Sequence, residues 1–218
     1  MKLSVVIGGS SGIGLAVAKK LSYSCRVVNM SRNPAEGTDN IKLDVTDYES
    51  VKAAFTELKE RYGVPDIMVY CSGYVEPLGI LEMNEESWRK TMDTNLTGAF
   101  FCTREYVRIS REKKGKIIYL ASTAGMRPQT GWSAYAASKA GLINFSLTMS
   151  EELKDYNIKV YCVAPGRCAT PLRSILAPNE DPNTIMQPDE VAEFIEYLAN
   201  KDKVIDGQAI VVKKSPKD

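Results

Sequence analysis

The sequence predicts an α/β fold, a doubly wound parallel sheet of about seven strands with helices on both faces. Short apolar runs, each of a length typical of buried strands, alternate along the chain with longer segments of helical periodicity. A glycine-rich turn joins the first run to the first helical segment, and no repeat or low-complexity tract interrupts the alternation. Parallel sheets built in this way bind ligands at the carboxyl ends of their strands. The whole chain, residues 1–218, is expected to form one domain.

The composition argues against several classes of function. A net charge of +1 over 218 residues does not favour a nucleic-acid-binding surface. The chain has no histidine, and its five cysteines form no C-x-x-C pair, so we expect neither a metal site nor a disulfide framework. No apolar run reaches the roughly 18 residues of a membrane span. We therefore expect a cytoplasmic protein that binds neither nucleic acid nor membrane.

The first predicted strand, residues 3–7, runs into a glycine-rich turn that precedes a helix over residues 15–21. The glycines remove side chains where backbone N–H groups and the positive end of the helix can face an anion, which is how the pyrophosphate of a dinucleotide is held. The spacing is G-x-x-x-G-x-G and not the usual G-x-G-x-x-G, so a tight turn without a ligand is the alternative. The predicted cofactor contacts of the turn are Gly8, Ser10, Ser11, Gly12, Ile13 and Gly14.

The second predicted strand, residues 25–30, ends at Ser31 and Arg32. In dinucleotide-binding folds an acidic residue at this place binds the ribose 2′-hydroxyl and selects NAD. Serine and arginine can instead hydrogen-bond and neutralise a 2′-phosphate, so we predict NADP(H), with NAD(H) less favoured. The alternative is that Arg32 is an ordinary exposed arginine. A third strand, residues 41–45, places Asp44 where its carboxylate could face the adenine amino group.

Ser122, Tyr135 and Lys139 form the predicted catalytic site. An apolar strand, residues 116–121, ends directly before Ser122, and a loop then leads to a helix that begins at Tyr135. Tyr135 and Lys139 are four residues apart and share a helix face, where the ammonium would lower the pKa of the phenol and make it a proton donor. The pair alone carries no weight, because Tyr-x-x-x-Lys also occurs at residues 48 and 197. The Tyr135/Lys139 pair differs from the other two in its setting, because a strand that ends in serine and a loop precede it.

A long helical pattern from residue 84 to about 110 contains Asn95 in its interior. Asparagine is unfavourable in mid-helix, so Asn95 marks either a kink with a polar role or a tolerated flaw. Residues 172–188, rich in Pro and Asn, are predicted to be irregular and to form a substrate lid. The segments 74–83 and 124–133 are also expected to face the substrate. Other helices are predicted over 47–62, 136–153 and 189–200, and other strands over 66–70, 158–163 and 208–212.

Taken together in this order and spacing, these residues resemble the short-chain dehydrogenase/reductase family over nearly the whole chain. The resemblance implies a Rossmann-type fold and a homodimer or homotetramer built on helix faces around 95–111 and 136–152. It implies that Tyr135 gives a proton to a carbonyl oxygen that Ser122 orients. It also implies that Lys139 holds the nicotinamide ribose and that Asn95 completes a tetrad by holding a water. The further cofactor contacts that it implies are Val45, Cys71, Ser72, Gly73, Tyr135, Lys139, Pro165, Gly166, Cys168 and Thr170.

A few positions depart from the family pattern. Ile7 stands where the family usually has Thr, and residues 70–73 read Tyr-Cys-Ser-Gly in place of Asn-Asn-Ala-Gly. Ser11 stands where many NADP users have a basic residue. These departures concern the cofactor pocket more than the catalytic residues.

The predicted function is NADP(H)-dependent reduction of a ketone or aldehyde to an alcohol, or the reverse reaction. One alternative is a catalytically silent dinucleotide-binding or scaffold protein of the same fold. Another is a different doubly wound enzyme such as a methyltransferase, although the acidic residue expected at the end of its second strand is missing here. The partner is expected to be a small carbonyl or alcohol substrate, and ketones, aldehydes, sugar-like polyols and acyl thioesters all remain open.

Overall fold

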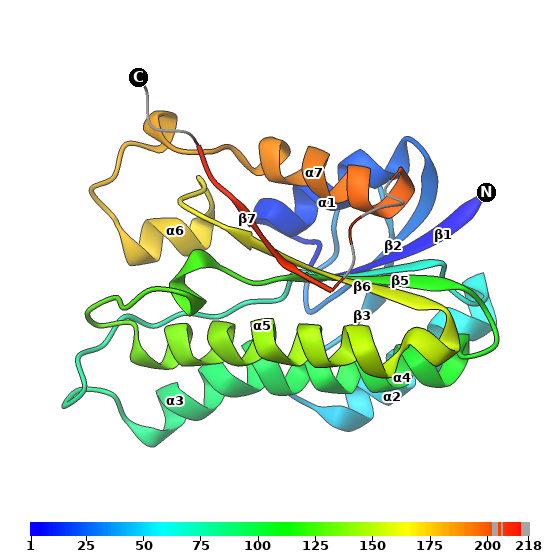
Figure 1. Ribbon diagram of the computed structural model, residues 1–218, viewed down its shortest axis with the longest axis horizontal. Coiled ribbons are helices and arrows are strands. Elements are labelled where there is room, and N and C mark those ends of the chain that lie inside the picture. The colour runs from blue at the N-terminus through cyan, green and yellow to red at the C-terminus, as the bar shows by residue number, and fades with distance from the viewer. Residues whose placement is uncertain (202–204, 206, 215–218) are drawn as a thin grey trace.

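The computed structural model describes residues 1–201, 205 and 207–214. In this part of the chain the strands form one parallel sheet in the order β3-β2-β1-β4-β5-β6-β7 (Figure 1). The strands are β1 (Lys2–Ile7), β2 (Cys25–Ser31), β3 (Asp39–Lys42), β4 (Ile67–Tyr70), β5 (Gly115–Leu120), β6 (Ile158–Pro165) and β7 (Ala209–Val212). This order confirms the predicted doubly wound parallel sheet. Residues 202–204, 206 and 215–218, which the predicted domain 1–218 includes, lie outside the described residues.

Helices cover both faces of the sheet (Figure 1). One face carries α1 (Gly12–Ser22) and α7 (Pro188–Asn200), and the other carries α2 (Tyr48–Tyr62), α4 (Gly98–Ser110) and α5 (Ser133–Glu152). Two shorter helices, α3 (Glu85–Met92) and α6 (Pro171–Leu176), follow β4 and β6 at the carboxyl ends of the strands. None of the described helices is both long and apolar enough to span a membrane.

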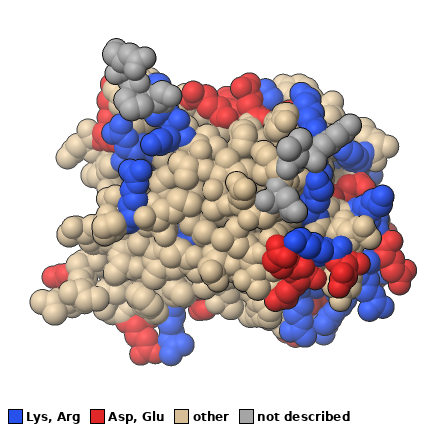
Figure 2. All heavy atoms as spheres, viewed as in Figure 1, with Lys and Arg blue, Asp and Glu red and all other residues tan. Residues whose placement is uncertain are grey.

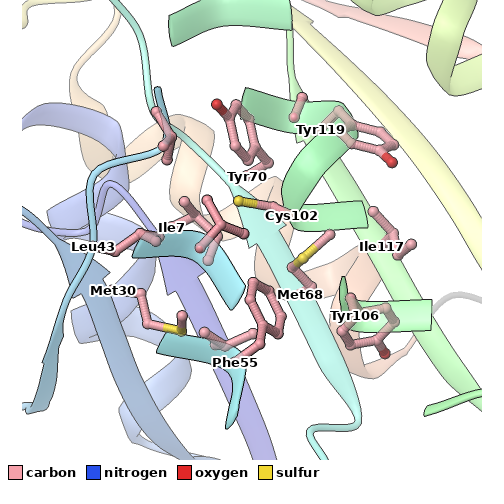
Figure 3. Close-up of a cluster of buried hydrophobic side chains, with 14 of the residues drawn as sticks. Ile7, Met30, Leu43, Phe55, Met68, Tyr70, Cys102, Tyr106, Ile117 and Tyr119 are labelled. Carbon is pink, nitrogen blue, oxygen red and sulfur yellow. The ribbon is translucent and has the colours of Figure 1, made fainter. Parts of the chain in front are cut away.

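The larger of the two cores lies between the sheet and the α2, α4 and α5 layer. Figure 3 shows part of it, with Phe55 from a helix beside Met68 from a strand. Fully burying one such side chain stabilises the fold by about 1.5–3 kcal/mol. A second core fills the space between the other face and the α1 and α7 layer. Apolar side chains on both faces explain why the strands read as continuous apolar runs.

The structure differs from the sequence prediction at the third strand, which ends at Lys42 and not at residue 45. Beyond it, the amide of Asp44 donates to the Ser50 hydroxyl at 3.0 Å, and the Asp44 carboxylate accepts from both the amide and the hydroxyl of Thr46. These local bonds take the chain out of the sheet toward α2. Asp47 then caps that helix by accepting from the amide of Glu49.

The segment predicted to be irregular, 172–188, contains the short helix α6 and a 3₁₀ turn, η4 (Pro182–Thr184). Thr170 caps α6 by accepting a hydrogen bond from the Arg173 amide at 3.1 Å. Pro171 follows at the first helical position, where its fixed φ and missing N–H favour a helix start. Proline therefore begins a helix in a segment whose Pro and Asn content predicts irregular structure.

Candidate active site

A cavity of about 510 Å³ lies at the carboxyl ends of the strands. Every predicted cofactor contact lines it, and Ser122 lines it together with Tyr135 and Lys139. Asn95 is the one predicted site residue that does not. The sheet topology thus brings the glycine turn after β1 and the polar residues after β5 into the lining of one cavity.

The glycine turn has the backbone geometry of an anion cradle. Gly8 has a φ of +81°, and a Cβ on it would lie 2.7 Å from the amide nitrogen of Ser72. A Cβ on Gly14 would collide with the carbonyl oxygen of Gly8. Ser11, at the N-cap of α1, makes no side-chain cap bond, so the first-turn N–H groups of the helix keep their capacity for an anion. These residues fit the pyrophosphate of a dinucleotide.

Another part of the cavity lining, where the sequence predicts the adenosine contacts, follows the end of β2. The side-chain Nδ2 of Asn29 donates to the Ser31 hydroxyl at 3.0 Å, and that hydroxyl donates to the backbone carbonyl oxygen of Asn33 at 2.5 Å. Arg32 is exposed and lines the cavity. Across from it, burial tends to raise the pKa of Asp44, but the two bonds from Thr46 and the charge of Arg32 hold that pKa below its ordinary value. Asp44 is therefore ionised at neutral pH.

Ser122, Tyr135 and Lys139 lie close together in the lining of the cavity. Ser122 lies just beyond β5 and accepts a bond from the Ala124 amide at 3.1 Å. The Lys139 Nζ donates to the carbonyl oxygen of Leu120 at 2.9 Å and lies 5.8 Å from the centroid of the Tyr135 ring. Both side chains are buried, Tyr135 at 7% and Lys139 at 3% exposure. The helical spacing therefore pairs these two residues as predicted.

Burial changes the proton affinities in a way that the sequence did not predict. It raises the pKa of Tyr135, while contact with the Ser122 hydroxyl and the charge of Arg173 oppose that rise. It also lowers the pKa of Lys139 to about 8, because the ammonium loses its hydration. The net direction for Tyr135 is thus opposite to the lowered pKa that the sequence predicts for the phenol. A raised pKa leaves Tyr135 protonated at neutral pH, the state that a proton donor requires.

Asn95 lies in a π-helical turn, η1 (Asp93–Thr97), that separates α3 from α4. Its side-chain oxygen accepts from the Tyr74 amide at 2.7 Å, and its Nδ2 donates to the Tyr74 carbonyl and to the Ser138 hydroxyl at 2.9 Å. The Ser138 hydroxyl donates in turn to the carbonyl oxygen of Tyr135. Of the two alternatives for Asn95, the structure thus has the kink with a polar role. Asn95 ties the loop after β4 to the catalytic helix.

Apolar side chains surround Tyr135 beside the cavity. Val75, Ala124 and Tyr135 form a small buried cluster against which Trp132, Leu172 and Leu176 pack. Arg167 and Arg173 also line the cavity, as do Asn33, Leu43, Thr46, Thr94, Leu120, Ala121, Thr123, Gln129 and Pro171. Most of these follow a strand end or begin α6, so the carboxyl-end rule could have found them. Met126 and Arg127, in a segment expected to face the substrate, are exposed and do not line the cavity. No residue of the loop 74–83 lines it either, and Val75 of this loop packs with Ala124 and Tyr135 in the buried cluster.

Fold and site together define an α/β enzyme with a dinucleotide cradle and a buried tyrosine–lysine pair. The model of the short chain dehydrogenase family matches residues 2–181. The chain is 31% identical to the 3-oxoacyl-[acyl-carrier-protein] reductase MabA of Mycobacterium bovis, over 95% of this chain and 90% of that protein. It is also 31% identical to cis-4-hydroxycyclohexanecarboxylate dehydrogenase of Sinomonas cyclohexanicum, over 91% and 89% of the two chains.

A solved structure of a variant actinorhodin polyketide ketoreductase with NADPH matches with a TM-score of 0.86 and 27% identity, over 97% of this chain and 95% of that one. The chain therefore belongs to the short-chain dehydrogenase/reductase family, oxidoreductases that act on CH–OH or carbonyl groups with a nicotinamide dinucleotide. Among the described residues, no group of three or more His, Cys, Asp or Glu could hold a metal ion.

Proposed function

We propose that this protein reduces a ketone or aldehyde to an alcohol with NADP(H), or catalyses the reverse reaction. The observation that carries the proposal is that the glycine cradle and Ser122, Tyr135 and Lys139 line one and the same cavity. A bound nicotinamide dinucleotide would supply or accept the hydride. In the proposed complex the glycine turn after β1 binds the pyrophosphate, and the apolar side chains around Tyr135 exclude water from the reacting carbonyl.

In the reduction, the Ser122 hydroxyl orients the carbonyl oxygen and Tyr135 donates its proton to that oxygen as negative charge develops there. The ammonium of Lys139 stabilises the phenolate that remains. Asn95 acts through Tyr74 and Ser138 to hold the loop and the helix that frame the site. A screen of NADPH oxidation across ketones, aldehydes, sugars and acyl thioesters tests the proposal. A protein that binds NADPH but turns over none of them would be the catalytically silent alternative.

NADP(H) is the proposed cofactor because Ser31 and Arg32 stand where an NAD-specific site has a carboxylate. Arg32→Ala is expected to raise KM for NADPH by about 10–100-fold, the range of a lost charge-assisted bond to phosphate, and to leave KM for NADH nearly unchanged. Steady-state kinetics with both cofactors measures this, with the exposed Arg127→Ala as the matched control. Equal preference for the two cofactors in wild type and variant would contradict the assignment.

A homodimer or homotetramer is proposed from the surface of α5. The exposed residues of this helix before its last turn are Ala137, Ala140, Asn144 and Thr148, so an uncharged stripe runs along it. Figure 2 shows that the face over α5 and β7 is largely free of charged side chains, which gather at its edges. Such a face fits a second copy of the chain.

Light scattering at micromolar concentration is expected to give at least the mass of a dimer. Ala140→Glu, which buries a charge in the proposed interface, is expected to shift the mass toward the monomer, whereas Lys19→Glu on the exposed side of α1 leaves it unchanged. A monomeric mass for the wild type would contradict the proposal.

The free thiols of the described residues agree with a reducing compartment, and we propose the cytoplasm.

A further inference from the structure

The cavity lining near Tyr135 contains an arginine to which the proposed mechanism gives no task. Arg173, on α6, lines the cavity beside Trp132 and Tyr135. Its guanidinium carbon lies 5.8 Å from the centroid of the Trp132 ring, which packs edge-on against the Tyr135 ring at 6.2 Å. The Arg173 side chain is only 18% exposed. Its charge is therefore largely removed from bulk water and close to the proton donor.

Glu180 holds this guanidinium in a fixed orientation. The Arg173 Nε donates to one Glu180 carboxylate oxygen at 2.6 Å, and Nη2 donates to the other at 2.9 Å. Arg167 Nη1 donates to the same carboxylate at 3.0 Å. One carboxylate shared by two guanidinium groups leaves a net positive charge. Glu180 takes two of the five N–H groups of Arg173, and the others have no acceptor within the part of the chain that the structure describes.

The charges around the cavity are unevenly distributed. Four of its charged lining residues are cationic: Arg32, Lys139, Arg167 and Arg173. Its one acidic lining residue, Asp44, interacts with Arg32. The lining near Tyr135 thus combines apolar side chains with cations and no lining carboxylate. Because a water-excluded site strengthens charge interactions, such a compartment favours an anionic ligand.

We propose that Arg173 is a specificity-determining residue that binds a carboxylate on the substrate, so that the preferred substrates are oxo acids. This rests on the proposed function: the oxo group faces Ser122 and Tyr135 while the carboxylate accepts from the N–H groups of Arg173 that Glu180 does not use. The neutral thioester carbonyl of a 3-oxoacyl substrate lacks such a charge. Thr170, which lines the cavity, also caps α6, so the start of the helix is fixed at the proposed cofactor site.

The test compares pyruvate, acetoacetate and levulinate with their methyl esters, which keep the carbonyl and remove the charge. Wild-type kcat/KM with NADPH is expected to favour at least one acid over its ester by about 10–100-fold, the range that a charge-assisted bond supplies. Arg173→Met is expected to abolish that preference, because it lowers kcat/KM for the acid and leaves kcat/KM for the ester unchanged. Arg173→Lys keeps the charge and retains part of the preference. The exposed Arg127→Met, in the same region of the chain as Trp132, is the matched control.

Glu180→Gln separates substrate recognition by Arg173 from the structural role of the Arg173–Glu180 ion pair. The variant weakens this ion pair and keeps the guanidinium of Arg173. The inference expects this variant to keep the acid preference or increase it. Equal losses for acid and ester in both Arg173→Met and Glu180→Gln would overturn the inference and assign Arg173 a structural role.

Two further outcomes distinguish the inference from the proposed function. Equal wild-type turnover of acids and esters, lost in Tyr135→Phe, overturns the role of Arg173 and leaves the reductase standing. If no compound is turned over, the proposed function has failed for this set, and thermal stabilisation of the NADPH-loaded protein decides the inference. If an oxo acid stabilises the wild-type protein but not Arg173→Met, the inference is supported. If no oxo acid stabilises the wild-type protein, the inference is overturned.

Discussion

Replacing Tyr135 with phenylalanine is expected to lower turnover by about 10²–10⁴-fold, the usual contribution of a positioned general acid, while NADPH binding persists. The change removes one oxygen atom and keeps the ring that packs against Trp132. Because burial raises the pKa of Tyr135, the wild-type hydroxyl holds its proton at neutral pH and remains a donor. Initial rates of NADPH oxidation and a fluorescence titration of the cofactor measure the two effects separately.

Tyr197→Phe is the matched control for this experiment. Tyr197 has the same Tyr-x-x-x-Lys spacing, lies on α7 and is 42% exposed, so the loss of its hydroxyl is expected to change neither turnover nor binding. Near-normal turnover in Tyr135→Phe would end the assignment of the proton donor. Equal losses in both variants would indicate a general loss of folded protein.

The sheet was predictable because its strands are buried on both faces and therefore read as uninterrupted apolar runs. The cavity was predictable for a related reason. In a parallel sheet the carboxyl ends of the strands meet at one edge, so residues after three separate apolar runs, such as Gly8, Ser122 and Pro165, were expected to converge. Neither inference required knowledge of side-chain contacts.

Other features depended on contacts between distant parts of the chain. The π-helical turn at Asn95 is stabilised by bonds to Tyr74 and Ser138, which no local helix propensity contains. The carboxylate that orients Arg173 comes from the loop after α6. The proton affinity of Tyr135 depends on how deeply the fold buries it, and this reversed the shift expected from a neighbouring ammonium. Sequence spacing can predict that a tyrosine and a lysine lie side by side. It does not predict how far burial removes their hydration, and that loss shifts the pKa of Tyr135 in the direction opposite to the effect of the ammonium.

Lys139 is expected to contribute catalysis at a cost to stability. The proposed proton transfer needs its ammonium beside Tyr135, yet burial lowers the pKa of Lys139 to about 8. In the reduction direction, kcat/KM is therefore expected to fall as the pH rises above about 8 and the ammonium is lost. Lys139→Met is expected to lower turnover by at least about 10²-fold and to remove this limb of the pH–rate profile.

The same variant is expected to be more stable than the wild type. A folded-state pKa below the ordinary lysine value of 10.5 means that the unfolded chain binds this proton more tightly. The resulting penalty on the wild type is full below about pH 8 and fades as the pH rises toward 10.5. Lys139→Met is thus expected to raise the free energy of unfolding by about 1–3 kcal/mol at pH 7, after the lost bond to Leu120 is discounted, and by less at pH 10.

Urea unfolding at the two pH values measures this difference, and Lys201→Met on the exposed end of α7 is the control. A variant that loses both activity and stability would identify Lys139 as a structural residue. A variant that loses activity while gaining stability would show a buried charge retained for its chemistry, since an apolar side chain at the same position has no charge to desolvate.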